Sequence, residues 1–325
     1  MGRRALVVGI DAYPSAPLRG CAADADSIAD RLRLHSDGSP NYAVRLETSA
    51  ADLDRAGLRR LLEELFENAQ GQDLLFYFSG HGRQTTFGAQ LVTADLDGVG
   101  MDDLLAVANG SSATSVTLIL DCCFSGNVGN SSAMQATQVA EQFRKQISLL
   151  RDGVTVLAAS RPDELSWEKD GHGVFTRLLI DGLDGGATDH LGIVTPLSLY
   201  GFASPALGAW DQRPIFKAHL VEPPVIRRAP AWIDPALLRD LPSHFTAPNA
   251  RVTMSPEHEG DGRPFPYGEG TEAQRQFDFF KQLRNANLLT TDGAEDLYFA
   301  ALNSHDVYLT PLGQYFWGRA DRGLV

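Results

Sequence analysis

The chain has 325 residues, of which 43% are apolar and 21% charged, a composition typical of soluble globular proteins with a substantial core. This length favours one large α/β domain with a smaller appended domain. The formal net charge of −13 argues against a nucleic-acid-binding surface, which needs a basic face. The negative charge is explained by solubility alone, or by attraction to basic segments of a protein partner.

Cysteine usage and hydropathy indicate the compartment. The three cysteines are Cys21, Cys122 and Cys123; an odd count with two adjacent residues is a poor disulfide framework. No Cys/His spacing matches a zinc site. The N-terminal apolar run is too short for a signal-peptide core, and no run approaches transmembrane length. We therefore expect a cytoplasmic protein that does not bind membranes.

The first two thirds of the chain alternate strand-like and helix-like segments. Short apolar runs predict strands at 5–10, 44–47, 74–78, 116–120 and 154–159. Apolar residues at helical spacing predict helices at 22–34, 52–68, 134–150 and 174–183. This order predicts a mostly parallel sheet with helices on both faces, in which sites form at the carboxyl edge of the strands.

The last third has a different composition. Five prolines in 223–244 predict an extended linker. We therefore expect a domain at 1–222 and a small α+β domain at 245–325. In the latter, the sequence predicts a helix at 272–289, a short hairpin at 296–307 and a closing helix at 308–317. This order resembles a winged-helix module, although the net acidity disfavours a transcription factor.

Two reactive residues stand where predicted strands end, with Gly82 directly after the first and Gly126 three residues after the second. His81 lies in FSGHG, directly after one strand, and Cys123 lies in DCCFSG, after the next. A lone loop histidine is usually a surface residue, and a cysteine that ends an apolar strand usually packs in the core. Placed together at one sheet edge, the pair indicates a thiol hydrolase in which His81 manages protons. The backbone amides of Gly82 and Cys123 are the candidate oxyanion donors. Physics alone does not choose between Cys122 and Cys123 as the nucleophile.

Several motifs, in order, resemble the landmarks of metacaspases and bacterial caspase homologues. They are ALVVGIDAY, LRGCAADA, YFSGHG, LDCCFSG and GVFTRLLIDGLDG, which lie between residues 4 and 220. The resemblance implies a caspase-hemoglobinase-like three-layer sandwich. It also implies that Cys123, the third residue of a D-x-C-x-S-G pattern, is the nucleophile and that Cys122 packs inward. Phe124 and Asp11 depart from the residues common in the family, His and Asn respectively.

The resemblance further implies an acidic pocket for an Arg or Lys side chain of the substrate. The matching positions are Cys21, Asp24, Ser79 and Asp121. Two carboxylates suit bidentate pairing with a guanidinium. The alternative is that Asp24 caps a helix and Asp121 braces a turn. Arg19, nearby in sequence, leaves specificity for Asp substrates open.

Regulation is partly implied by the same family. Its chemistry requires no cofactor, but some members are activated by calcium, for which acidic residues follow the histidine: Asp95, Asp97, Asp102 and Asp103. Members are often cut in the segment that corresponds to 127–153, which here holds Arg144, Lys145 and Arg151. Trp167 and Glu168 are candidates for the border of the substrate groove.

The leading interpretation is a cysteine endopeptidase that cleaves protein substrates after Arg or Lys. By family analogy it acts in a bacterial defence or programmed-death pathway, and the C-terminal domain binds a regulatory protein. The alternatives are a protease with another specificity, such as Asp, and a non-catalytic scaffold of the same fold. Because both His81 and Cys123 are present, the scaffold is disfavoured.

Overall fold

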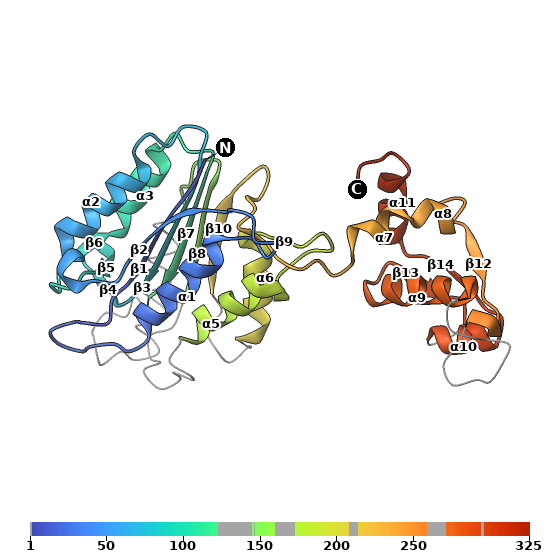
Figure 1. Ribbon diagram of the computed structural model, residues 1–325. Coiled ribbons are helices and arrows are strands. Elements are labelled where there is room, and N and C mark those ends of the chain that lie inside the picture. Colours follow the sequence, from blue (N-terminus) through green and yellow to red (C-terminus); the bar gives the residue numbers. More distant parts are fainter. Residues whose placement is uncertain are drawn as a thin grey trace. The chain divides into compact units, whose positions relative to one another are not determined.

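The computed structural model describes residues 2–122, 145, 147–159, 173–207, 214–258, 271–293 and 296–325. These residues form two compact units, Met1–Pro230 and Ala231–Val325, and each unit has buried apolar residues of its own (Figure 1). Most of the predicted helix at 134–150 lies outside the described residues, as do Cys123, Trp167 and Glu168.

A six-stranded sheet forms the centre of the first unit. Its order is β10-β8-β7-β3-β1-β2, and every neighbouring pair is parallel except β10 with β8. The strands are β1 (Arg3–Gly9), β2 (Ala43–Glu47), β3 (Asp73–Ser79), β7 (Ser115–Asp121), β8 (Val154–Ala158) and β10 (Ile215–His219). The predicted mostly parallel sheet is confirmed, and the first five strands match the predicted apolar runs to within two residues at each end.

Helices cover both faces of this sheet, which gives three layers (Figure 1). Side chains of a strand alternate between faces; Phe76 and Phe78 therefore pack in one core and Leu75 and Tyr77 in the other. The first core holds α2 (Arg55–Phe66) and α3 (Met101–Gly110). The second holds α1 (Cys21–Arg33), α5 (Val174–Asp181) and α6 (Pro196–Ala206). Strands buried on both faces explain why their sequences are continuous apolar runs.

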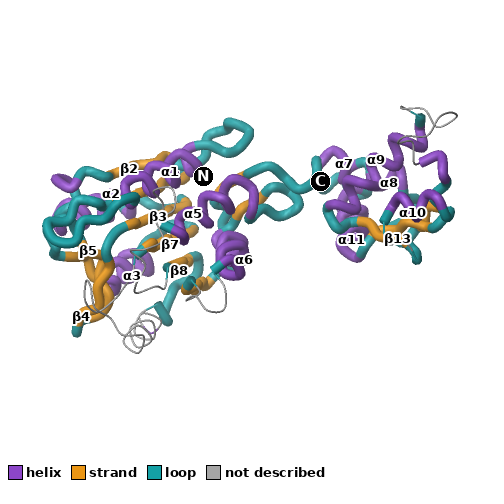
Figure 2. Tube along the Cα trace, turned by 90° about the horizontal axis from the view of Figure 1, so that it is seen from below, coloured by secondary structure: helices purple, strands orange, loops and turns teal. Residues whose placement is uncertain are grey.

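A small antiparallel sheet follows β3 and was not expected from the sequence. It consists of β4 (Gly82–Thr85), β5 (Gly88–Val92) and β6 (Gly98–Gly100). Figures 1 and 2 place it beside α3, and Figure 1 shows it away from the edge strand β10. The strands are short and contain glycine, so they lack the long apolar pattern that identifies a buried strand. The sheet connects His81 directly to α3.

Short elements complete the first unit. They are the 3₁₀ turn η1 (Ala50–Asp52), the π-helical turn η2 (Gly182–Gly186), and the two-stranded ribbon of β9 (Ile193–Val194) with β11 (Arg227–Arg228).

The second unit contains a three-stranded antiparallel sheet with helices. Its elements are α7 (Pro235–Arg239), α8 (Leu241–His244), β12 (Arg251–Thr253), η3 (Pro256–His258), α9 (Glu272–Asn285), β13 (Leu289–Thr291), α10 (Leu297–Leu302), β14 (Asp306–Leu309) and α11 (Pro311–Ala320). Its core includes Phe245 and Phe280, both fully buried. The winged-helix likeness of this unit stays a prediction.

Two segments of the second unit differ from the sequence-based expectation. Part of the proline-rich segment 223–244 is helical, since Pro235 starts α7 and Pro242 lies in the first turn of α8; proline is tolerated there because the first N–H groups of a helix have no intrahelical partner. The predicted hairpin at 296–307 is wrong. Asp296 instead caps α10 by accepting a hydrogen bond from the Phe299 N–H, and a single strand follows.

Among the described residues, no helix has both the length and the apolar character needed to cross a bilayer.

Candidate functional site

His81 stands between two sheets, after β3 and before β4. Its N–H donates to the hydroxyl of Tyr13 at 3.0 Å, and that hydroxyl donates to the carbonyl of Val92 at 3.1 Å. The Val92 N–H in turn donates to the His81 carbonyl at 2.9 Å. The Tyr13 hydroxyl is thus inserted between two backbone groups that would otherwise pair in the antiparallel ladder of β4 and β5.

Tyr13 also packs against the imidazole, with the two ring centroids 4.6 Å apart. Burial raises the pKa of Tyr13, so its hydroxyl remains protonated. Gly80 makes the close approach feasible, because a Cβ at that position would lie 2.6 Å from the Tyr13 hydroxyl oxygen. The sequence motif ALVVGIDAY contains this tyrosine, but no sequence pattern assigned it a role.

The ring of His81 is oriented by a backbone carbonyl. Its Nε2 lies 2.7 Å from the oxygen of Ala16. A carbonyl only accepts hydrogen bonds, so Nε2 carries the proton and, in the neutral ring, Nδ1 keeps its lone pair. Ala16 has a φ of 67°, in the left-handed region that is uncommon for alanine. This loop geometry therefore selects the tautomer in which Nδ1 is the base.

Cys122 follows β7 and points into the first unit's core. It is 2% exposed and packs among the apolar residues beneath the sheet. The predicted inward packing of Cys122 is confirmed. Cys123 lies outside the described residues.

The ends of β3 and β7 bring the pocket positions Ser79 and Asp121 together, and the end of β1 lies against Cys21 at the start of α1. Gly9 pairs with Ser79, and Ser79 pairs with Asp121, in the parallel register of the sheet. Helix α1 starts against this edge, since a Cβ on Gly9 would lie 2.1 Å from the Cys21 carbonyl oxygen. Asp11 accepts hydrogen bonds from the first two amides of α1, those of Cys21 and Ala22. A helix N-terminus is an electropositive end that suits this carboxylate.

Asp24 is a buried carboxylate in the first turn of α1, 2% exposed. The Ser79 hydroxyl donates to its Oδ2 at 3.5 Å, and the Gly173 N–H donates to the same oxygen at 3.3 Å. Burial raises the pKa of the Cys21 thiol, so that Cys21 remains a neutral thiol.

Asp121 is held by a relay of hydroxyl groups. Thr176 Oγ1 donates to Asp121 Oδ2 at 2.5 Å and lies 2.5 Å from the hydroxyl of Tyr77. Because Thr176 has a single proton, it accepts from Tyr77. Burial raises the pKa of Asp121. Thr176, Tyr77 and Gly173 were not identified by sequence reasoning, although Gly173 and Thr176 lie in the motif GVFTRLLIDGLDG.

The structure therefore brings Cys21, Asp24, Ser79 and Asp121 to one sheet edge, with His81 two residues beyond Ser79. The alternative that Asp24 serves as a helix cap does not hold, because its side chain bonds to Ser79 and Gly173 while Asp11 caps α1.

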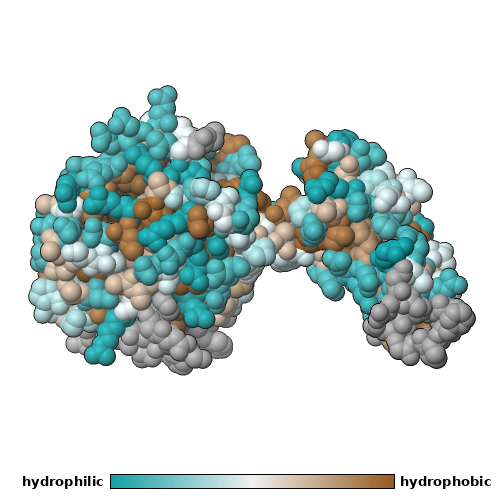
Figure 3. Space-filling view, in the orientation of Figure 1, coloured by the Kyte–Doolittle hydropathy of each residue, from teal (hydrophilic) through white to brown (hydrophobic). Residues whose placement is uncertain are grey.

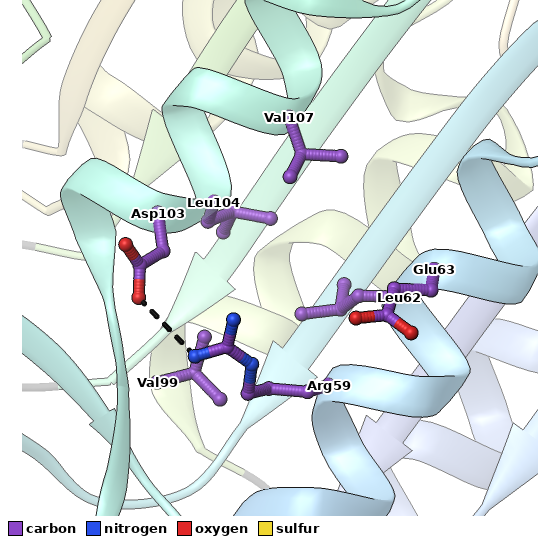
Figure 4. A pocket seen from close by; sticks show the side chains of 7 residues that line it. All are labelled: Arg59, Leu62, Glu63, Val99, Asp103, Leu104 and Val107. Carbon is purple, nitrogen blue, oxygen red and sulfur yellow. Dashed lines mark ion pairs between the residues drawn. The ribbon is translucent and has the colours of Figure 1, made fainter.

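The four acidic residues proposed for calcium do not form a common ligand set. Asp97 pairs with Arg55 and Arg83, at 3.2 and 3.8 Å. Arg59 of α2 reaches Asp103 of α3 at 3.7 Å, across an apolar pocket (Figure 4). Within the described part of the chain, no group of three or more His, Cys, Asp or Glu side chains is placed to hold a metal ion.

Comparisons with known proteins found a matching family model and similar solved structures. The family model of the caspase domain, Peptidase_C14, matches residues 2–219. The solved structure of protein GSU0716 from Geobacter sulfurreducens is 20% identical, with a TM-score of 0.51, and the match covers 71% of this chain and 98% of that one. Caspase-1 from Spodoptera frugiperda is 13% identical, with a TM-score of 0.48 and coverage of 70% and 90%. No curated protein sequence matches significantly.

Proposed function

Because this chain belongs to the caspase-domain family of cysteine peptidases, we propose that it is an active endopeptidase that cleaves proteins after arginine or lysine. One observation carries the proposal. The same sheet edge holds an imidazole with a selected tautomer and two carboxylates, the buried Asp24 and the partly buried Asp121.

In this mechanism Cys123 is the nucleophile and His81 the proton carrier. His81 takes the proton of the Cys123 thiol, the thiolate attacks the carbonyl carbon of the scissile bond, and protonated His81 gives its proton to the departing amine. Water then attacks the thioester, neutral His81 takes a proton of that water, and the acid product leaves as the thiolate and protonated His81 are regenerated. The burial of Cys122 supports this assignment, since a thiol packed in the core is not accessible to a substrate.

Gly82 is the proposed second donor to the oxyanion. In an antiparallel ladder, hydrogen-bonded pairs alternate with non-hydrogen-bonded pairs. The Val92 N–H donates to His81 O, so the next pair, Gly82 with Leu91, is of the second kind. The Gly82 N–H therefore points away from β5, which leaves it able to bind the developing charge.

The proposed pocket binds the residue before the scissile bond through charge. Two carboxylates attract a guanidinium or ammonium group and repel a carboxylate. Arg19, the residue that left Asp specificity open, is exposed. Specificity for Asp is thus the less favoured alternative.

Fluorogenic peptides that differ only in the residue before the scissile bond test the proposal. We expect turnover with Arg and Lys and none with Asp. Turnover of the Asp peptide alone would show that the enzyme cleaves after Asp and not after Arg or Lys. If none of the three is cleaved, with or without added calcium or prior cleavage of the chain, the non-catalytic scaffold is correct.

Tyr13→Phe is expected to reduce kcat about 10- to 100-fold with little change in KM, the range of a misplaced acid–base group. The substitution keeps the ring but leaves the His81 N–H and the Val92 carbonyl without the hydroxyl. Tyr13 acts through His81 and touches no substrate, so the pH dependence of kcat should shift as well. Steady-state kinetics against pH checks this. A variant that loses thermal stability but keeps the wild-type kcat and pH profile would show a purely structural role.

We further propose that cleavage between 127 and 153 accompanies activation. Arg151 is an unsuitable cleavage site, because its guanidinium donates to the carbonyls of Ala108 and Ala113. Lys145 is exposed, which supports it as a site, and Arg144 lies outside the described residues. Intact mass measurement of fully active enzyme should find fragments that end near these two residues; a full-length chain alone would contradict the proposal.

The second unit is proposed to bind a regulatory protein. It exposes several large apolar side chains: Trp232, Tyr298, Phe299, Leu312, Tyr315 and Leu324. Apolar surface is also seen on the face of this unit drawn in Figure 3. A role in bacterial defence or programmed death stays a prediction from the family resemblance.

A further inference from the structure

Gly173 occupies a position in the pocket where the backbone does not require glycine. It precedes α5 with φ −64° and ψ 140°, values that any residue adopts. Glycine at this position is therefore explained by its lack of a side chain and not by its backbone conformation.

The space at Gly173 lies between the two carboxylates. A Cβ built on this residue would lie 3.2 Å from Asp121 Oδ2 and 3.4 Å from Asp24 Oδ2. The distance to Asp121 is shorter than an ordinary contact between a methyl group and an oxygen, and the distance to Asp24 is at the lower limit of such a contact. A side chain here would occupy the volume that both carboxylates face.

The first turn of α5 fixes both carboxylates around that volume. The Gly173 N–H donates to Asp24, and the Thr176 hydroxyl donates to Asp121. Thr176 and Tyr77, which continue this network, are both fully buried. The two acidic side chains are thus held apart by groups that have little freedom to move, so the volume between them has a fixed size.

We propose that Gly173 determines the preference for arginine over lysine by leaving room for a planar guanidinium between Asp24 and Asp121. A guanidinium offers five N–H donors in a fixed plane and binds two carboxylates at once, whereas an ammonium is compact and needs less room. This inference rests on the proposed function, since it concerns the pocket of the same peptidase.

The test compares two peptides, identical except for Arg or Lys before the scissile bond, in wild type and in Gly173→Ala. The variant keeps the N–H that binds Asp24 and adds only a methyl group. We expect kcat/KM for the Arg peptide to fall at least about tenfold more than for the Lys peptide, a difference of ~1.4 kcal/mol. The loss should be mainly an increase in KM. Gly201→Ala is the matched control, because Gly201 lies inside α6 and a Cβ there meets nothing within 4 Å.

The outcomes separate this inference from the proposed function. The ratio of two kcat/KM values from one preparation does not depend on how much of the enzyme is folded. An unchanged Arg/Lys ratio in Gly173→Ala, with an active wild type, overturns the role of Gly173 alone. A wild type that cleaves neither peptide overturns the proposed function and this inference together.

A second measurement covers the case in which Gly173→Ala does not fold. Agmatine and 1,5-diaminopentane present a guanidinium and an ammonium, respectively, on a short alkyl chain. As competitive inhibitors of the wild type, agmatine is expected to bind at least about tenfold more tightly. Equal inhibition by the two compounds would overturn the proposal.

Discussion

Cys123→Ala is expected to lower kcat/KM toward a basic peptide by at least about four orders of magnitude, as loss of a covalent nucleophile does in other hydrolases. Cys122→Ala should keep wild-type kinetics, because the Cys122 side chain is 2% exposed and packs in the core. It should instead lower the free energy of unfolding by about 1 kcal/mol, the usual scale for a small cavity.

Peptide kinetics and thermal unfolding on the same two variants check this pair of expectations. Each variant is the control for the other, since the substitution is chemically identical and the positions are adjacent. The assignment of the nucleophile is wrong if Cys122→Ala is inactive while Cys123→Ala retains turnover. Equal unfolding temperatures of Cys122→Ala and wild type would contradict the packing argument only.

The central sheet was predictable because its strands are buried on both faces. Runs such as Leu74–Phe78 are apolar without interruption, and their order along the chain with helices between them determines a parallel sheet. The small sheet after His81 was not predictable in this way. Its strands have three to five residues and are stabilised by the ladder itself and by α3 rather than by a long apolar face.

The residues of the candidate site were also only partly predictable from the sequence. His81 was found because it follows one predicted strand at the sheet edge where Cys123 follows the next, whereas Asp24 and Asp121 were found through the family resemblance. Thr176 and Gly173 were missed because hydroxyl-bearing residues and glycine are common and their roles depend on distances. Only the folded chain shows that the hydroxyl of Thr176 reaches Asp121 and that Gly173 borders two carboxylates.

Asp121→Asn is expected to lower kcat/KM for an Arg peptide about 100-fold at neutral pH, the cost of removing one member of a buried charge pair. The amide still accepts a hydrogen bond from Thr176, so the fold is retained.

The wild type should also lose activity as the pH falls through the raised pKa of Asp121, because the protonated carboxyl no longer attracts the substrate cation. The variant should lack this acid limb. Profiles of kcat/KM against pH for both proteins measure the difference, and identical acid limbs would contradict it.

Stability should change with pH in the opposite direction to activity. Burial raises the pKa of Asp121 in the folded state. At pH values between the pKa of the unfolded state and that of the folded state, the folded chain therefore binds the proton more tightly than the unfolded chain does. The contribution of Asp121 to stability is therefore largest at pH values below the unfolded pKa and decreases as the pH rises through the folded pKa. Asp121→Asn removes this dependence, so its unfolding temperature relative to wild type should increase from acidic to neutral pH.

The fold is thus expected to be most stable when Asp121 is protonated, whereas the enzyme is expected to be most active when Asp121 is charged. A charge that lowers stability but is needed for activity is typical of a binding site and not of a structural brace. A difference in unfolding temperature that shrinks with rising pH would mean that the Asp121 carboxylate stabilises the fold, and Asp121 would then be a structural residue.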